Sequence, residues 1–283
     1  MRLEPTTELN LRQIDANADG GLTRTQGEAR LEKLTQELGE LQELFYAAGK
    51  TSLLVILQGI DTSGKDGAIR GVFAGVNPQG CQVTSFKTPT AAELDHDFLW
   101  RIHRHTPALG MIGVFNRSHY EDVVVVRVRK LAPASVWRRR YSQINAFERL
   151  LTENGTIVLK FYLHISNEEQ EARLLAREQD VTKFWKLSAQ DWIERRSWDD
   201  YIRAYEDALR RCSTEAAPWT IIPANRKWFR NLAIAERIVQ SLRPLRQGWL
   251  DALEQKGDSE RAAIVKARAK TIGELGTKRT KVR

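Results

Sequence analysis

The sequence predicts an α/β fold in which a mostly parallel sheet lies between two layers of helices. Short apolar runs typical of buried strands recur along the chain, and segments with helical spacing of apolar residues follow them. Strands that alternate with helices favour parallel pairing, because each helix carries the chain back across a face of the sheet. The 283 residues, of which 42% are apolar, suffice for one large domain with appendages.

The elements can be placed in order along the chain. Residues 1–21 are expected to be irregular. Strands are expected at 52–58, 82–86, 111–115, 156–165 and 219–223. Helices are expected at 23–49, 65–76, 90–103, 134–152, 167–178 and 227–242, with a further helix beginning after 115. Thr23 with Gln26 and Thr90 with Glu93 have the spacing of capping boxes, which mark helix starts.

Composition excludes several classes of protein. Cys81 and Cys212 form no CxxC pair, so neither a disulfide scaffold nor a zinc site is indicated. No apolar run is long enough to span a membrane and the N-terminus lacks a signal pattern, so we expect a cytoplasmic protein. Residues 261–283 hold eight basic residues and one acid, which accounts for most of the net charge of +8. We therefore expect a domain at 22–250 and a basic, solvated tail at 251–283.

The run Gly59-Ile60-Asp61-Thr62-Ser63-Gly64-Lys65 has the pattern of a phosphate-binding loop. Glycines let successive backbone N–H groups point at an anion, and the following helix adds its N-terminal dipole. The loop lies between a predicted strand and a predicted helix, which favours this interpretation over an ordinary glycine turn. The fold is then a three-layer P-loop kinase-like sandwich. We expect phosphate contacts from Gly59, Thr62, Ser63, Gly64, Lys65, Asp66 and Gly67.

Two acids in and beside this loop indicate a metal. Asp66 occupies the position where most P-loops carry Ser or Thr, and Asp61 lies inside the loop. A carboxylate close to phosphates is repulsive unless a cation lies between them. The sequence therefore predicts Mg²⁺, with Mn²⁺ as a substitute, held partly by Asp61.

A second set of charged residues follows the strand at 111–115. Arg117, Glu121 and Asp122 should emerge beside the loop, because ligands in such sheets bind beyond the carboxyl ends of the strands. Arg117 would neutralise a transferring phosphoryl group, and Asp122 would bind the metal or orient the attacking phosphate. The alternative is that Glu121 and Asp122 only favour a helix N-terminus through its dipole.

The segment at about 173–203 is rich in basic and aromatic side chains. Its cations include Arg173, Arg177, Lys183 and Lys186. In P-loop kinases a basic lid closes over the phosphates and excludes water, so we expect a helical lid here. The alternative is a pair of solvated helices with ordinary salt bridges, which the interspersed acids support.

The chain resembles the polyphosphate kinase 2 family over roughly residues 22 to 245. The matching stretches, in order, are Gln58-Gly59-Ile60-Asp61-Thr62-Ser63-Gly64-Lys65-Asp66-Gly67, Thr84-Ser85-Phe86-Lys87, His96-Asp97-Phe98-Leu99-Trp100-Arg101, Val114-Phe115-Asn116-Arg117-Ser118-His119-Tyr120-Glu121-Asp122-Val123, Tyr162-Leu163-His164-Ile165-Ser166, Trp198-Asp199-Asp200-Tyr201 and Ala217-Pro218-Trp219. One departure is Val181-Thr182 after Asp180, where members often have proline.

The resemblance implies magnesium-dependent phosphoryl transfer between inorganic polyphosphate and nucleoside mono- or diphosphates. It implies catalytic roles for Asp61, Lys65, Arg117 and Asp122, with Asp122 as the metal-binding acid. It places Lys183 and Lys186 on the polyphosphate path, and we tie nucleotide choice to Glu121 and Arg117. The motif Asn-Arg-Ser-His-Tyr-Glu-Asp at residues 116–122 is similar to that of the branch that accepts both AMP and ADP, and GDP is expected as a further acceptor. A homodimer or homotetramer is implied as well.

Two rival functions stay open at this stage. One is an ordinary nucleotide kinase that takes its phosphoryl group from ATP. The other is a nucleic-acid-binding P-loop module that uses the basic tail, which would bind RNA or DNA in a salt-sensitive way. The loop and the strand-end residues argue against nucleic acid as the main partner, and no membrane partner is expected.

Overall fold

The computed structural model describes residues 1–4, 8–186 and 188–280, of which residues 272–280 are described by their backbone alone. Its centre is a five-stranded sheet with the order β2-β3-β1-β4-β5. The strands are β1 (Ser52–Gln58), β2 (Cys81–Ser85), β3 (Ile112–Asn116), β4 (Thr156–His164) and β5 (Trp219–Pro223). All four strand pairs are parallel, which confirms the predicted fold class.

Strand β1 lies in the middle of the sheet because its sequence has two apolar faces. All of its residues are buried, including the polar Ser52 and Gln58 at its two ends. β1 pairs with β3 on one side and with β4 on the other. The strands that follow β1 in the chain are therefore placed on both of its sides, so the strand order switches direction at β1. In open α/β sheets, ligands bind beyond the carboxyl end of the strand at such a switch point. The predicted phosphate loop follows β1 directly.

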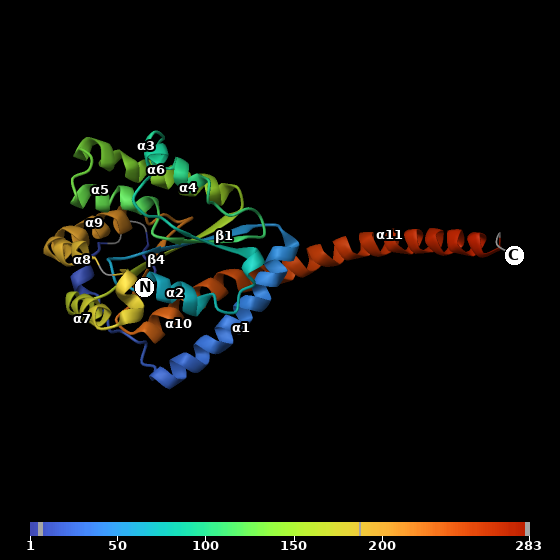
Figure 1. Cartoon of the computed structure of the whole chain (residues 1–283), viewed down its shortest axis with the longest axis horizontal. Helices are drawn as coiled ribbons and strands as arrows, with labels where there is room; N and C mark the ends of the chain where they lie inside the picture. Colours follow the sequence, from blue (N-terminus) through green and yellow to red (C-terminus); the bar gives the residue numbers. More distant parts are fainter. Residues whose placement is uncertain (5–7, 187, 281–283) are drawn as a thin grey trace.

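Helices cover both faces of the sheet (Figure 1). One face packs on α1 (Arg24–Ala48), α2 (Lys65–Val72), α10 (Lys227–Leu242) and the start of α11 (Arg246–Thr280). The other packs on α5 (Val125–Val128), α6 (Ala134–Glu153) and α9 (Trp198–Arg211). Alternate residues of β1 divide between two cores: Leu53 and Val55 belong to the first, Leu54 and Ile56 to the second.

Both predicted capping boxes are present, at Thr23 with Gln26 and at Thr90 with Glu93. The predicted helix 90–103 is wrong as one element, because it is split into α3 (Ala91–Leu94) and α4 (Trp100–His103). The carboxylate of Asp97 accepts a hydrogen bond from Leu99 N at 2.9 Å, and such a local bond competes with continuous helix.

The segment after β3 begins with a 3₁₀ turn, η3 (His119–Asp122), before α5. The predicted lid segment consists of α7 (Asn167–Glu178), the 3₁₀ helix η4 (Val181–Lys186), α8 (Ala189–Glu194) and the short η5 (Arg195–Ser197), which leads into α9. The remaining 3₁₀ turns are η1 (Leu11–Gln13), η2 (Pro78–Gly80) and η6 (Arg243–Leu245). Figure 1 shows α7 and α8 at the end of the body that is opposite α11.

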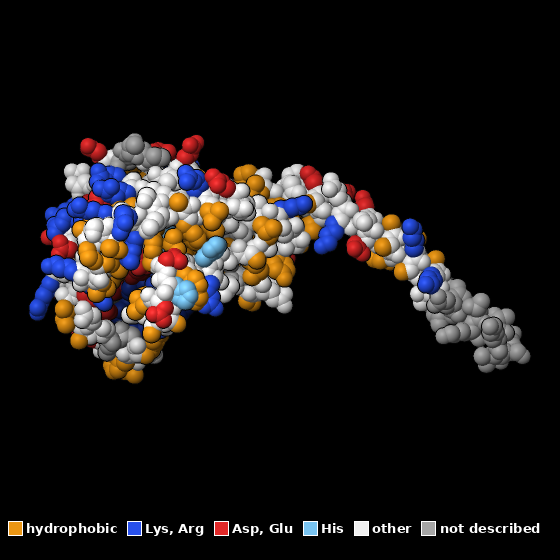
Figure 2. Space-filling model, turned by 90° about the horizontal axis from the view of Figure 1, so that it is seen from above, with side chains coloured by type: hydrophobic (Ala, Val, Ile, Leu, Met, Phe, Trp, Pro, Cys, Tyr) orange, Lys and Arg blue, Asp and Glu red, His pale blue; other side chains and the backbone are white. Residues whose placement is uncertain are grey.

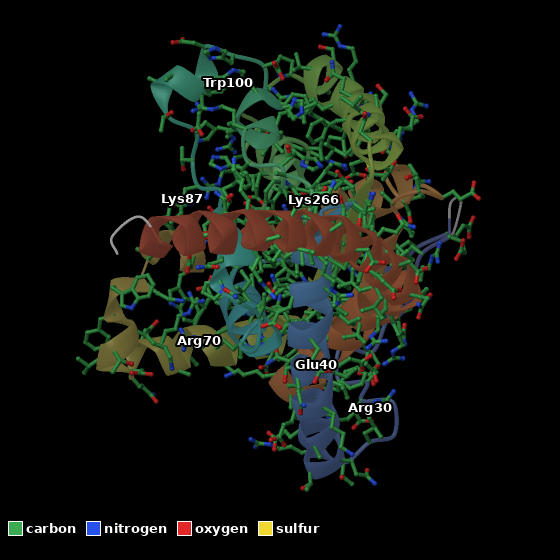
Figure 3. The ribbon with its side chains drawn as sticks, turned by 90° about the vertical axis from the view of Figure 1, so that its right-hand side faces the viewer. Arg30, Glu40, Arg70, Lys87, Trp100 and Lys266 are labelled. Atoms are coloured by element: carbon green, nitrogen blue, oxygen red, sulfur yellow. The ribbon has the colours of Figure 1, made fainter. Side chains whose placement is uncertain are left out.

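The two chain ends behave differently. Arg2 forms a β-bridge with Thr220 and Leu3 is buried, so part of the irregular N-terminal segment is tied to β5. The basic tail, expected to be solvated, continues as the helix α11, which projects from the body (Figure 2) and whose described side chains from 258 to 271 are all exposed. Figure 3 looks at the molecule from this side, with Lys266 on α11 and Arg30 and Glu40 on α1. In the described chain no helix is both long and apolar enough to cross a membrane.

Candidate active site

The loop between β1 and α2 has the tight geometry that its glycines predict. Gly59 has φ 153° and Gly64 has φ 98°. A Cβ at Gly59 would lie 2.7 Å from Ser63 Oγ and 2.8 Å from Leu163 O, so no larger residue fits. No side chain caps α2, whose first residue is Lys65. Its N-terminal backbone N–H groups are thus available to an anion.

Lys65 lies folded over the loop that it terminates. Its ammonium donates to Gly59 O at 2.7 Å and to Ile60 O at 3.3 Å. Burial, and then the nearby charge of Arg117, lower the pKa of Lys65 to about 8, although Asp61 opposes the shift. The carbonyl oxygens of the loop therefore hold a desolvated cation at the loop itself. Such a cation gains more from a phosphate than a solvated lysine would.

Arg117 connects the ends of the two neighbouring strands β1 and β3. It follows β3 with φ 64°, a backbone conformation that is uncommon for a side chain of this size. Its guanidinium forms ion pairs with Asp61 in the loop and with Glu121, the latter at 3.1 Å. Although burial lowers the pKa of Arg117, the carboxylates of Glu121 and Asp61 hold it above its ordinary value. Sequence reasoning correctly placed these three side chains beside one another.

A pocket lies beside these residues. Its walls combine aromatic rings with charges of both signs, and they come from the loop, η3, α5 and the segment 191–205. The aromatic side chains are Trp198, Tyr201 and Tyr205, the acids are Asp61, Glu121, Asp191 and Glu194, and the cations are Arg117, Arg129 and Arg195. The mixture suits a ligand with a flat ring at one end and phosphates at the other.

The aromatic side of this pocket was not predicted from the sequence. Trp198, Tyr201 and Tyr205 come from one helix, α9, at a spacing that puts them on one face. Tyr201 donates to Glu194 at 2.8 Å, and Glu194 forms an ion pair with Arg129. The amphipathic spacing of α9 was a usable signal for this face, but it predicts burial and does not by itself predict a pocket.

Asp122 lies apart from the other predicted catalytic residues. Its Oδ1 pairs with Arg140 at 3.1 Å, and Arg140 also donates to the backbone carbonyl of Asp122. Burial raises the pKa of Asp122 to about 6, against the pull of Arg140 and Arg101. It does not line the pocket, and among the described residues no contact joins it to Asp61. Its assignment as a metal ligand stays a prediction.

Asp61 and Asp122 are the residues that would hold a magnesium ion. Asp122 Oδ2 is buried without a hydrogen-bond partner in the described structure, which suits a cation ligand. No group of three or more His, Cys, Asp or Glu gathers as a metal site within the described residues. Mg²⁺ usually takes only one or two carboxylates and completes its shell with phosphate oxygens and water, so the residues present fit it.

The predicted lid residues divide between two roles. Lys186 pairs with Asp66 in the first turn of α2, next to the loop, and Asn116 also donates to Asp66 at 2.7 Å. Lys183 pairs instead with Asp180 at 2.5 Å and does not contact the loop. Arg177 forms an ion pair with Asp191 at 3.3 Å.

Arg173 supports the loop directly, although the sequence placed it in a lid. Its guanidinium donates to the carbonyls of Thr62 and Ser63 at 2.9 and 3.0 Å, and to those of Ala224 and Asn225 at 2.6 and 3.0 Å. It thereby joins the phosphate loop to the chain after β5. Glu169 pairs with Arg173 at 2.7 Å and balances its charge.

A parallel sheet, a glycine loop opening a helix and a strand-end arginine define a P-loop kinase-like phosphotransferase fold. The family model for polyphosphate kinase 2 matches residues 21–247, and the chain belongs to this family. The earlier resemblance, drawn from motifs between 22 and 245, is confirmed.

Known relatives agree with this placement. The AMP/ADP-polyphosphate phosphotransferase of Meiothermus ruber is 47% identical over 86% of this chain and 92% of that protein. The ADP-polyphosphate phosphotransferase of Rhodopseudomonas palustris is 45% identical over 76% of this chain and 78% of that protein. The crystal structure of polyphosphate kinase 2 from Arthrobacter aurescens TC1 matches with a TM-score of 0.83 and 44% identity, over 86% of this chain and 88% of that one. The chain is therefore a polyphosphate kinase.

Proposed function

We propose that this enzyme transfers phosphoryl groups between inorganic polyphosphate and AMP or ADP, with magnesium. The observation that carries the proposal is the pocket whose walls combine the aromatic side chains of α9 with Arg117 and the loop. In this proposal the nucleotide ring binds beside Trp198 and Tyr201 and its phosphates bind Arg117. The similarity to the Meiothermus ruber enzyme, named for both AMP and ADP, supports acceptance of both nucleotides.

The transfer requires little covalent work from the protein. A terminal oxygen of AMP or ADP attacks the terminal phosphorus of polyphosphate, a P–O bond forms, and the bridging P–O bond breaks with its electron pair on the shortened chain. Lys65 and the N-terminus of α2 hold the transferred group, and Arg117 neutralises charge between donor and acceptor. Asp61 and Asp122 would hold a magnesium ion, whose positive charge would reduce the repulsion between donor and acceptor phosphates.

Arg117 is preorganised for this role by the two acids that hold it. Asp61 fixes one end of the guanidinium and Glu121 the other, so that little rotamer freedom is lost when a phosphate arrives. Glu121 lines the pocket as well, which links nucleotide choice to Arg117 orientation. GDP as an acceptor and assembly into a dimer or tetramer belong to the same proposal.

The test is transfer by purified protein with magnesium and polyphosphate as the only phosphoryl donor, and with AMP, ADP and GDP compared as acceptors. We expect ADP from AMP and ATP from ADP. Lys65→Ala should abolish turnover, whereas Lys33→Ala, at an exposed position on α1, should leave it unchanged. Full activity of Lys65→Ala, or product formation only when ATP is the donor, would contradict the proposal. The second result would identify an ordinary nucleotide kinase instead.

A further inference from the structure

Arg230, on the first turn of α10, is a buried cation that lies against the phosphate loop. Its side chain is only 3% exposed. A Cβ built on Gly64 would lie 2.0 Å from Arg230 Nη1, and one built on Gly67 would lie 3.1 Å from Nη2. The guanidinium therefore contacts the backbone at the last glycine of the loop and in the first turn of α2. The two glycines leave the space that it occupies.

Within the described residues no acidic side chain balances the charge of Arg230. Nε and Nη2 both donate to the side-chain oxygen of Asn231, at 3.0 and 2.7 Å, and this oxygen carries no net charge. No carboxylate of the described chain comes within ion-pair distance of it. The N-terminus of α2, which the guanidinium faces, has a positive dipole end.

Two further cations accompany Arg230. Arg173 of α7 reaches the same glycine, because a Cβ built on Gly64 would lie 3.5 Å from its Nη1. Lys227 lies one helical turn before Arg230 on α10. Burial and then the charge of Arg173 lower the pKa of Arg230 to about 10, and burial and Arg173 also lower the pKa of Lys227, although Glu169 opposes that shift. Arg173, Arg230 and Lys227 thus form a row of cations that begins at Gly64.

Such a row disfavours the ligand-free fold, since like charges repel and a buried charge loses its hydration. Hydrogen bonds to Asn231 do not compensate for this loss. An anion with charges repeated along its length would compensate, because each cation could face a separate phosphate.

We infer that Arg230 and Lys227 form a subsite for the internal phosphates of the donor, so that polyphosphate leaves the loop over Gly64 and follows the first turn of α10. The inference rests on the proposed function and adds to it the path along which the polyphosphate donor binds.

The nucleotide is the less suitable occupant of this subsite. Arg230 and Lys227 do not line the pocket that contains Trp198 and Tyr201. The neighbouring ring on α10, Trp228, packs against Gly27 of α1, where a Cβ would lie 2.3 Å from the indole. Phe229 of the same helix packs against Gly20, where a Cβ would lie 3.5 Å from its ring, and against Trp228. Both rings are thus engaged with the protein, whereas a phosphate chain needs no stacking partner.

The test uses the full chain with saturating ADP and compares two donors, long-chain polyphosphate and tripolyphosphate. Lys227→Met and Arg230→Met should each raise the KM for long-chain polyphosphate about tenfold, which corresponds to one lost charged hydrogen bond. The KM for tripolyphosphate should change less than about twofold, because a short donor reaches fewer cations. Arg230→Lys, which keeps the charge, should recover part of the loss.

The matched control is Arg226→Met, which removes a cation next to Lys227 in sequence. Arg226 is exposed and pairs with Asp19, so this variant should leave both KM values unchanged. Circular dichroism shows whether Arg230→Met is folded, and if it is not, Lys227→Met decides alone because Lys227 is exposed.

The outcomes separate this inference from the proposed function. If the wild-type enzyme transfers nothing from polyphosphate to any nucleotide, the proposed function is wrong. If it does transfer, but both variants keep the wild-type KM for long-chain polyphosphate, the subsite is overturned. A rise in the KM for ADP without a rise for polyphosphate would overturn it as well, since the cations would then serve the acceptor.

Discussion

Lys160 and Arg230 are both buried cations, but the protein surrounds them in opposite ways. Lys160, on β4, donates to Glu148 at 2.5 Å, to Tyr120 Oη at 2.9 Å and to Cys212 O at 2.6 Å. Arg230 has one neutral amide oxygen as its side-chain acceptor within the described chain. The difference separates a cation that belongs to the fold from one that awaits a ligand.

The position of the Lys160 network explains why it is fully satisfied. Glu148 of α6 also binds His119 at 3.2 Å and Tyr120 at 2.8 Å. These residues lie in η3, immediately before Glu121 and Asp122. The network therefore fixes the turn that carries Glu121, predicted to govern nucleotide choice, and Asp122, predicted to be catalytic. Arg230, in contrast, faces the loop where an anion is expected.

The largest expected effect is on stability and comes from breaking the satisfied pair. Glu148→Gln should lower the free energy of unfolding by roughly 3–5 kcal/mol, because it leaves the Lys160 charge buried without a counter-ion. Urea unfolding followed by circular dichroism measures the change. The control is Glu153→Gln on the same helix, whose exposed ion pair with Arg149 should contribute less than about 1 kcal/mol. Equal losses in the two variants would contradict the comparison.

The same pair should govern the stability of the protein in acid. Burial raises the pKa of Glu148, but Lys160 and His119 outweigh it and hold the net pKa below the ordinary value of 4.5. As the pH falls below 4.5, Glu148 therefore takes up a proton in the unfolded chain before it does so in the folded protein. The free energy of unfolding decreases over this range, until the pH has fallen through the lower pKa of folded Glu148. In Glu148→Gln the acid limb should be flatter by up to about 1.4 kcal/mol per pH unit. An unchanged slope would exclude Glu148 as its source.

The third prediction addresses the unsatisfied cation. Arg230→Met should leave the stability of the ligand-free protein unchanged or raise it by about 1 kcal/mol, since it removes an uncompensated buried charge. Urea unfolding without phosphate measures this value, and Arg226→Met serves as the exposed control. A loss as large as that of Glu148→Gln would show that Arg230 is a structural cation like Lys160, and the comparison would fail.

Sequence reasoning succeeded where a short motif determines geometry. The spacing from Gly59 to Lys65 predicted the loop, and the strand order brought Arg117 to Asp61 because neighbouring parallel strands end at one edge. The apolar runs predicted all five strands to within a residue or so.

The rest depends on contacts between distant segments. Nothing in the sequence around Arg230 marks it as a neighbour of Gly64. The two helices α10 and α2 come to lie side by side only when both pack on the same face of the folded sheet. Arg173 belonged to a predicted lid by its spacing but supports the loop through four carbonyls. The split of 90–103 into α3 and α4 depends on a hydrogen bond of Asp97, which helix propensity does not capture.

The smallest expected effect concerns a third group of cations, the solvated ones on α11. Deletion of residues 257–283 should change the free energy of unfolding by less than about 0.5 kcal/mol, because the described side chains from 258 to 271 are exposed. The retained part of α11 keeps Trp249, which packs against Phe45 of α1 at 5.4 Å between ring centroids. Urea unfolding and the KM for polyphosphate measure the result, and we expect both to stay near the wild-type values. Salt-sensitive RNA or DNA binding that disappears with the deletion, together with loss of transferase activity, would instead make nucleic acid the main partner.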